Sequence, residues 1–177
     1  MTDAADPRPL LAVDSPSMLF RAFYALPDSI KGKDGRPVNA LLGATNLILR
    51  EVEEYEPRAV ALCFGPDAAD YRVELYDGYH ADRPDVPDDL APQFAACEEY
   101  FGAFGWTVAI HDTLEADDLL GSYATLEEAA GGDTCGEGGG SGDRLDGRAC
   151  ERRRDEMTSR AHVALTRCGG RGLEPAG

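Results

Sequence analysis

The chain has 177 residues, 43% of them hydrophobic, and a formal net charge of −16. This length allows one α/β domain with a buried core and is too short for two large domains. The acidic balance argues against a surface coated with basic side chains for nucleic acid, but it is compatible with a metal-dependent nuclease that uses a few local arginines.

The charge is unevenly distributed along the chain. Residues 1–143 hold 9 basic and 28 acidic side chains, whereas residues 144–177 hold 8 Arg, no Lys and 5 acidic side chains. From residue 131 on, the composition is rich in Gly and then in Arg, and it predicts no further strand. We therefore predict one folded domain over residues 8–130 and a disordered tail over residues 131–177.

The five cysteines show neither a CxxC pair nor the spacing of a zinc site. Cys63 and Cys97 lie in apolar surroundings, which is typical of small core residues in a reducing cytosol. The start of the chain has no basic region followed by an apolar run, and no apolar run is long enough to span a membrane. We expect a cytoplasmic protein with no membrane partner.

The first predicted element is a buried strand over residues 9–13, which ends at Asp14. A helix follows it, and we expect Ser15 to cap this helix, with Pro16 at the first helical position.

A polar, glycine-containing loop over residues 31–37 leads to the next helix. Asn39 is expected to cap this helix, and its apolar stripe extends to Val52. Residues 59–64 form a continuous apolar run that ends at Gly65, which predicts a strand buried on both faces, as in a parallel sheet covered by helices.

Residues 70–93 show no clear periodicity, and a helical pattern resumes over residues 94–104. A third strand is expected over residues 106–110 and a helix over residues 115–130. Strands that alternate with helices predict an α/β fold with an open, mostly parallel sheet and flanking helices. Ligands of such sheets bind beyond the carboxyl ends of the strands.

Acidic residues gather where two of these strands end. Asp14 follows the first strand, and Glu115, Asp117 and Asp118 follow the third. Two such charges about 6 Å apart repel by about 3 kcal/mol at an effective dielectric constant of ~20. A fold that gathers them gains most by binding divalent cations, and Mg²⁺ and Mn²⁺ prefer oxygen ligands. The simpler interpretation is that the acidic triplet only begins a helix, where it stabilises the helix dipole.

Six short stretches of the chain resemble, in the same order, the N-terminal part of the bacterial 5′→3′ exonucleases, the family that includes the 5′ nuclease domain of DNA polymerase I and flap endonucleases. They cover roughly residues 8–130 and are Leu11–Asp14, Met18–Pro27, Asp34–Ala40, Tyr71–Tyr76, Tyr79–Pro84 and Glu115–Asp118.

The resemblance implies a PIN-like 5′ nuclease core with a helical arch, and a mechanism with two divalent ions, Mg²⁺ or Mn²⁺, that activate water and stabilise charge on the reacting phosphodiester. By position, the catalytic and metal-binding residues would be Asp14, Glu115, Asp117 and Asp118.

The resemblance also implies DNA-binding residues in the arch segment, through which single-stranded 5′ ends would pass. These are Arg72, Tyr79, His80 and Arg83. Arg would bind phosphate and Tyr would stack on a base, whereas His80 stands where the family has Lys and makes a weaker phosphate contact. Taken without the resemblance, the same residues are typical of a solvated, salt-bridged loop.

The chain departs from the family at other positions. Gly65 stands where the family has an Asp ligand, and Asp67 is the available substitute. The family's later Gly-Asp-Lys/Arg-Asp element is matched only in part around Asp143, to which we assign no role. No segment matches the helix–hairpin–helix region that grips duplex DNA.

The break in composition after Gly132 coincides with the end of the resemblance. A one-base frame error in a GC-rich gene, which would exchange apolar codons for Gly and Arg codons, is one hypothesis for this break. Resequencing tests it, because a frame that restores an apolar strand followed by Gly-Asp-x-Asp must then exist.

The sequence predicts a metal-dependent 5′→3′ exonuclease or flap nuclease that acts on DNA 5′ ends or flaps, with a separate polymerase as a partner. As a truncated catalytic domain, the isolated chain is expected to have low or no activity. Two alternatives stay open: a non-catalytic nucleic-acid-binding remnant of the family, and a small single-strand ribonuclease on a similar acidic sheet, which would not need residues 71–84.

Overall fold

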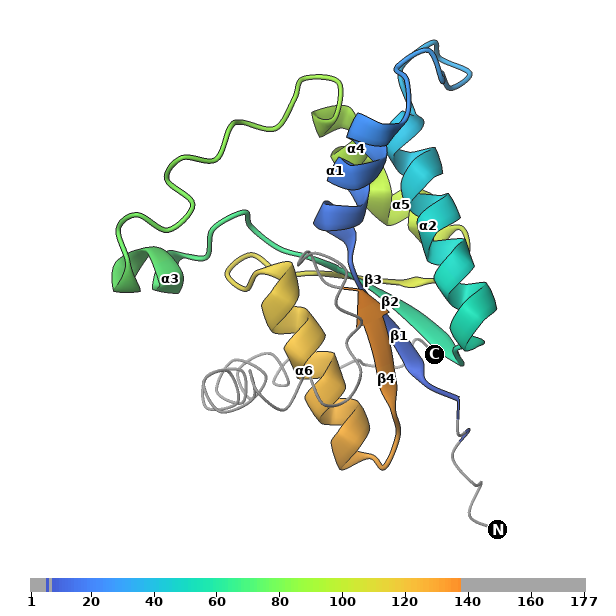
Figure 1. Ribbon diagram of the computed structural model, residues 1–177, viewed down its shortest axis with the longest axis vertical. Coiled ribbons are helices and arrows are strands. Elements are labelled where there is room, and N and C mark those ends of the chain that lie inside the picture. The colour runs from blue at the N-terminus through green and yellow to red at the C-terminus, as the bar shows by residue number, and fades with distance from the viewer. Residues whose placement is uncertain (1–5, 7, 138–177) are drawn as a thin grey trace, which may run out of the picture.

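The three apolar runs form the strands of a parallel sheet. In the computed structural model, which describes residue 6 and residues 8–137, these strands are β1 (Leu10–Asp14), β2 (Ala59–Phe64) and β3 (Thr107–Ile110). β2 lies between β1 and β3, and both pairings are parallel (Figure 1). Parallel neighbours need long crossover connections, and here each connection contains helices. The predicted open α/β sheet with flanking helices is confirmed.

A fourth strand, β4 (Thr134–Glu137), lies within the segment predicted to be a disordered tail. It pairs in parallel with β1, so that the sheet order is β3-β2-β1-β4. The prediction that no strand follows residue 131 is therefore wrong. The hydrogen bonds between β4 and β1 come from backbone groups, which Gly136 also supplies. β4 therefore forms at the edge of the sheet, next to the buried β1, although its composition does not favour a strand. The rest of the predicted tail, from residue 138, lies outside the described residues, as does Asp143.

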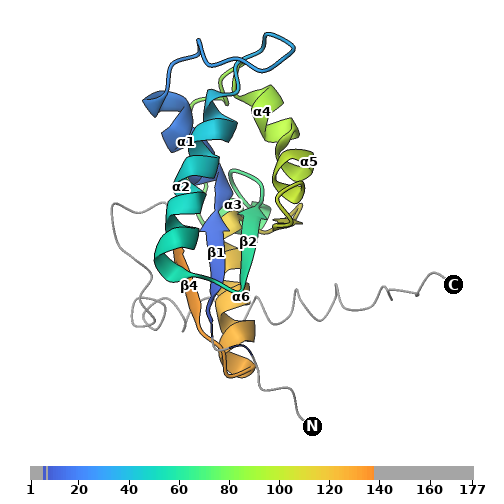
Figure 2. The same cartoon turned by 90° about the vertical axis from the view of Figure 1, so that its right-hand side faces the viewer.

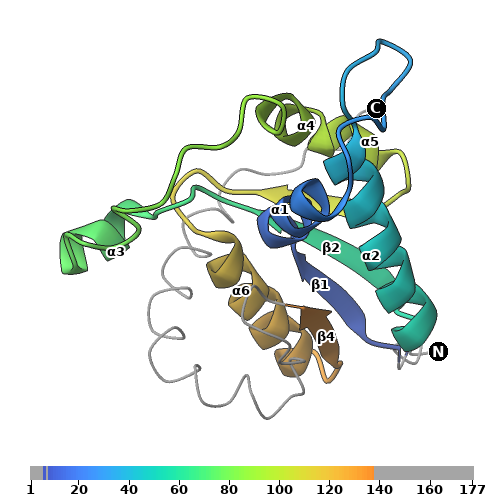
Figure 3. The same cartoon turned by 45° about the horizontal axis from the view of Figure 1, so that its top comes forward.

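Helices cover both faces of the sheet (Figures 1 and 3). One face carries α1 (Ser15–Ala25) and α2 (Asn39–Tyr55), together with the short helices α4 (Ala91–Ala95) and α5 (Cys97–Gly102). The other face carries α6 (Ala116–Ala129).

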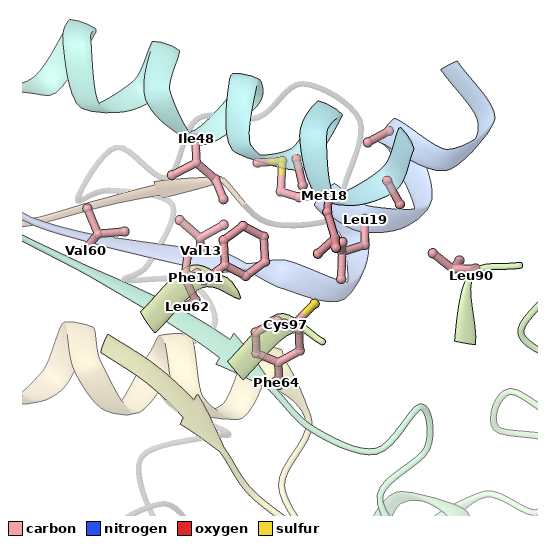
Figure 4. Packing of buried hydrophobic residues seen from close by; sticks show 14 of the residues in the cluster. Val13, Met18, Leu19, Ile48, Val60, Leu62, Phe64, Leu90, Cys97 and Phe101 are labelled. Carbon is pink, nitrogen blue, oxygen red and sulfur yellow. The ribbon is translucent and has the colours of Figure 1, made fainter. Parts of the chain in front are cut away.

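Alternating side chains of the strands divide the core into two clusters. Val13 and Leu62 belong to the larger cluster, which Figure 4 shows between the sheet and Ile48 of α2. Ala12 and Cys63 point to the other face and belong to the smaller cluster, which α6 completes. Burial on both faces explains why the first two strands read as continuous apolar runs.

The segment between β2 and β3 contains short helices. Residues 70–93 show no clear periodicity in the sequence, and the resemblance implies a helical arch in this part of the chain. They contain α3 (Asp70–Leu75), and the helix expected over residues 94–104 is divided at Ala96 into α4 and α5. Figures 1 and 3 show that α3 stands apart from the other helices. We refer to residues 70–83 as the arm.

The predicted cap of α2 is wrong. Val38 holds the cap position, and Asn39 is inside the helix, where its amide donates to the carbonyl oxygens of Phe23 and Leu26. The amide oxygen of Gln93 accepts the N–H groups of Ala40 and Leu41 instead. The first turn of α2 is therefore satisfied by a side chain distant in the sequence.

Cys63 and Cys97 are buried in the core, as predicted. Among residues 8–137, no helix combines the length and the apolar character that crossing a membrane requires.

Candidate active site

The carboxyl ends of β1 and β2 and the amino end of α6 meet at one edge of the sheet. Figure 2 shows the two strands pointing in the same direction. Asp14, the last residue of β1, is the register partner of Cys63, and Cys63 packs in one cluster with Ala116, the first residue of α6. The elements that carry Asp14 and the acidic residues 115–118 therefore meet at this edge, as expected from the sheet topology.

Asp14 caps α1, so the predicted cap, Ser15, is wrong. Its carboxylate accepts the backbone N–H of Ser17 at 3.2 Å and the Ser17 hydroxyl at 2.6 Å. Ser15 is the first helical residue. The carboxylate is buried, with 7% of the residue exposed, and both of its oxygens are bonded within the same turn. Asp14 therefore has a structural role at the start of α1.

Glu115 and Asp118 begin α6. Glu115 is the cap residue, and the Oδ2 atom of Asp118 accepts the backbone N–H of Glu115 at 3.1 Å, which is one half of a capping box. Both residues are buried. The simpler interpretation of the triplet, that it begins a helix, is thus correct for these two residues, but their remaining oxygens bind groups from another part of the chain.

Arg72 of α3 binds both of these carboxylates. Its Nη2 atom lies 2.6 Å from Oδ1 of Asp118, and its Nη1 atom lies 3.1 Å from Oε2 of Glu115. The Arg72 side chain is 23% exposed, and the two acidic side chains are 8–9% exposed. One guanidinium group therefore lies across the two most buried acids of α6.

Two tyrosines complete this network. The Tyr71 hydroxyl accepts a hydrogen bond from Nε of Arg72 at 2.7 Å and lies 2.8 Å from both carboxylate oxygens of Asp118. The Tyr79 hydroxyl accepts from Nη1 of Arg72 at 3.0 Å and donates to Oε2 of Glu115 at 2.9 Å. The guanidinium carbon lies 5.5 and 5.7 Å from the centres of the two rings, within the range of cation–π attraction.

The backbone N–H of Ala69 donates to Oε1 of Glu115 at 2.8 Å. Every carboxylate oxygen of Glu115 and Asp118 consequently has a partner. We call Tyr71, Arg72, Tyr79, Glu115 and Asp118 the arginine network.

The surroundings shift the pKa values of the network's donors. Burial disfavours the charge of Arg72, but hydrogen bonds to Tyr71 and Tyr79 and the charge of Asp118 outweigh it and raise the guanidinium pKa above its usual value. Burial and the neighbouring carboxylates raise the pKa values of Tyr71 and Tyr79. At neutral pH the network holds a cationic Arg72 and neutral tyrosines.

A divalent metal ion does not fit this arrangement of side chains. Within the described part of the chain, no three His, Cys, Asp or Glu side chains are grouped so that they could hold a metal ion. Glu115 and Asp118 bind Arg72, Asp14 binds Ser17, and Asp117 lies half-buried in the first turn of α6. The four predicted ligands share one edge of the sheet, but they do not form one ligand cluster.

Gly65 and Asp67 supply no replacement ligand. A Cβ atom added to Gly65 would lie 2.1 Å from the carbonyl oxygen of Leu114, so a side chain here requires the backbone before α6 to move. Asp67 is exposed, and its carboxylate lies 2.5 Å from Nη1 of Arg83. The interpretation of Asp67 as a substitute ligand is not supported by this contact.

The four predicted DNA-binding residues divide into two pairs. Arg72 and Tyr79 point into the arginine network. Arg83 and His80 lie near the base of the arm, where both contact Asp67, His80 through the backbone carbonyl at 2.6 Å. His80 has φ 57°, a left-handed conformation that is uncommon outside Gly, and its ring stacks on Tyr79 with the centroids 3.9 Å apart.

Tyr71 was given no role by the sequence-based prediction. The sequence offered one indication of its role: Tyr71 directly precedes Arg72, which the resemblance assigns to the arch. The contact itself joins residues 47 apart in the sequence, and local spacing does not reveal such a contact.

The fold and this edge define a class of protein: an open parallel α/β domain with buried carboxylates beyond the ends of its strands. Residues 9–135 match the family described as 5′-3′ exonuclease, N-terminal resolvase-like domain. The chain belongs to this family, as the resemblance of its short motifs predicted.

Curated relatives of the chain include exonucleases and polymerases. A 5′-3′ exonuclease of Mycobacterium tuberculosis is 39% identical over 132 residues, which cover 67% of this chain and 42% of that protein. A 5′-3′ exonuclease of Streptomyces coelicolor is 37% identical over 125 residues, with coverage of 64% and 42%. DNA polymerase I of M. tuberculosis is 36% identical over 130 residues, with coverage of 73% and 14%. The chain thus spans less than half the length of these relatives.

Among solved structures, the T5 D15 protein co-crystallised with metal ions is similar with a TM-score of 0.49 and 18% sequence identity, over 68% of this chain and 44% of that protein.

Proposed function

We propose that this domain is the N-terminal part of the catalytic unit of a 5′→3′ exonuclease or flap nuclease that hydrolyses phosphodiester bonds of DNA with Mg²⁺ or Mn²⁺. The family match over residues 9–135 is the observation that carries the proposal. The position of the acidic residues supports it, because ligands of open α/β sheets bind beyond the carboxyl ends of the strands. Asp14, Glu115, Asp117 and Asp118 are the proposed catalytic and metal-binding residues.

We propose DNA 5′ ends or flaps as the substrate and the arm as the part that contacts a single strand. Arg83 is half-exposed at the base of the arm, where it suits a phosphate contact. Relatives named DNA polymerase I suggest a polymerase as the partner activity, on the same or a separate chain.

Low or no activity is expected of the 177-residue chain on its own. Gly65 offers no ligand, and the oxygens of Glu115 and Asp118 are bound to Arg72 and its neighbours. The carboxylates must leave these partners before a divalent ion can use them.

Calorimetric titration with Mn²⁺ tests the metal site directly. We expect weak binding at two sites in the wild-type chain and its loss in Asp14→Ala, with Glu98→Ala, an exposed acid on α5, as the matched control. Equal binding in all three proteins contradicts the assignment of Asp14.

Cleavage of a 5′-flap DNA with Mg²⁺ tests the reaction. Under excess protein we expect at most slow cleavage, and any cleavage must be lost in Asp117→Ala. Fast turnover by the wild-type chain contradicts the proposed impairment, and cleavage that persists in Asp117→Ala contradicts the proposed site.

A second candidate is a non-catalytic nucleic-acid-binding domain of the same family. The closed arginine network favours it, because the carboxylates that would bind metal are bound to protein donors. This candidate predicts salt-sensitive binding of single-stranded DNA that persists in EDTA, without any uptake of Mn²⁺.

A further inference from the structure

Arg72 occupies the place of a cation at the two buried acids of α6. The guanidinium group contacts Asp118 through Nη2 and Glu115 through Nη1, and its Nε donates to Tyr71. Two carboxylates and one guanidinium leave a net charge of about −1 among largely buried side chains. The positive charge that this pair of acids needs thus comes from within the chain.

The two oxygens that Arg72 binds, Oδ1 of Asp118 and Oε2 of Glu115, each have a tyrosine hydroxyl as a second partner, so a divalent ion at either oxygen displaces one of these donors. Mg²⁺ requires near-octahedral oxygen ligands at about 2.0–2.1 Å, and a carboxylate oxygen turned to a guanidinium group has its lone pairs engaged. A second cation beside Arg72 also meets like-charge repulsion in a partly buried site. Occupation by Arg72 and occupation by metal are therefore alternatives.

The arm, which carries Arg72, has few buried contacts that would keep it attached to α6. None of the residues of α3 is buried, and Leu75 and Tyr76 are each 67% exposed. Tyr71 and Arg72 join α3 to α6 through polar contacts with Asp118. Releasing the arm thus breaks mainly polar contacts and exposes little apolar surface.

We propose that Arg72 is an internal cation that latches the arm onto Glu115 and Asp118, so that a divalent metal ion binds these acids only when the arm is released. Arg72 is in this sense a positioning residue that acts through the two carboxylates. The proposal rests on the metal site of the proposed function. It adds that Arg72 and the metal ion compete for Glu115 and Asp118, which family membership alone does not imply. Competition is reciprocal: bound metal must weaken the arm contact by the same factor by which the contact weakens metal binding.

The experiment measures metal affinity and arm opening in the full 177-residue chain. Mn²⁺ affinity is measured by calorimetry for the wild type, Arg72→Gln and Arg72→Lys. Arg58→Gln is the matched control, because it removes an ion pair with Glu127, which lies near the opposite end of α6 from Glu115 and Asp118. Hydrogen exchange of residues 69–83 is followed with and without Mg²⁺, because the Ala69 amide donates to Glu115 in the latched arrangement.

We expect Arg72→Gln to bind Mn²⁺ about 5- to 150-fold more tightly than the wild type, the usual range for coupled sites. Arg72→Lys should fall between them, because Lys keeps the charge and loses the planar fork. Mg²⁺ should speed exchange of the arm in the wild type and have no effect in Arg72→Gln, where the arm is already released. Arg58→Gln should match the wild type.

Equal Mn²⁺ affinity in the wild type and both Arg72 variants overturns the latch and leaves the proposed metal site standing. Absence of Mn²⁺ binding in every protein overturns the latch and the metal site together. If Arg72→Gln does not fold, Tyr79→Phe replaces it, because it removes the hydroxyl that joins Arg72 to Glu115, and unchanged affinity there overturns the latch as well.

Discussion

Two arginines of the arm each pair with an aspartate at nearly the same distance, but in different surroundings. Arg72 lies 2.6 Å from Asp118, and Arg83 lies 2.5 Å from Asp67. The first pair has side chains 23% and 8% exposed, and the second has side chains 52% and 60% exposed. Burial and additional donors, rather than the N···O distance, decide how much an ion pair contributes, so the two pairs should differ several-fold in their contribution to stability.

The largest expected effect is that of Arg72→Ala. Its removal leaves Glu115 and Asp118 buried without a cation, and we expect a loss of about 3 kcal/mol in the free energy of unfolding. This is at the lower end of the range for buried pairs, because part of the Arg72 side chain reaches solvent. Urea denaturation measures the loss, and a change below about 1 kcal/mol contradicts the distinction between the two pairs.

Tyr79→Phe should have the next largest effect. It removes a hydroxyl that accepts from Arg72 and donates to Glu115, and hydrogen bonds to charged groups contribute about 1.5–3 kcal/mol each. We expect a loss of about 2 kcal/mol in urea denaturation. Tyr24→Phe is the matched control, because Tyr24 is 71% exposed, and an equal loss in both variants shows that the network is not the cause.

Asp14→Ala is expected to cost about 1 kcal/mol, the usual value for a lost helix cap. Asp14→Asn should retain most of the stability, because an amide oxygen still accepts the N–H of Ser17. The melting temperatures of the two variants are compared with that of the wild type. If Asn is as damaging as Ala, the charge of Asp14 contributes to stability beyond the acceptance of the Ser17 N–H.

The sequence predicts the parts of this fold that local patterns determine. The apolar runs at residues 9–13 and 59–64 are long and buried on both faces, and their strands were located to within a residue or two. β4 was missed, because an edge strand whose bonds come from the backbone of β1 does not need an apolar composition. Its residues, Thr134–Glu137, look like a turn when they are read alone.

The candidate site shows the same limit. The acidic residues were found, because each follows a strand or begins a helix, and parallel topology brings such positions to one edge. Their actual partners were missed, since Arg72 meets Asp118 across 46 positions of the sequence. The cap of α2 by Gln93 is another such case, with 53 positions between the amide of Ala40 and its acceptor. Spacing predicts which residues share an edge and not which side chain reaches another.

The smallest effect is expected for Arg83→Ala, the counterpart of the Arg72 variant. Its pair with Asp67 is exposed to solvent and to screening by salt, and such pairs contribute about 0.2–1 kcal/mol. We expect a loss of less than about 1 kcal/mol in urea denaturation at low salt, and a still smaller one at 1 M salt, where charges are screened within about 3 Å. A loss as large as that of Arg72→Ala at both salt concentrations means that Arg83 stabilises the base of the arm through more than its charge. Release of the arm would then have to break two strong contacts, and the competition between Arg72 and metal would be correspondingly weaker.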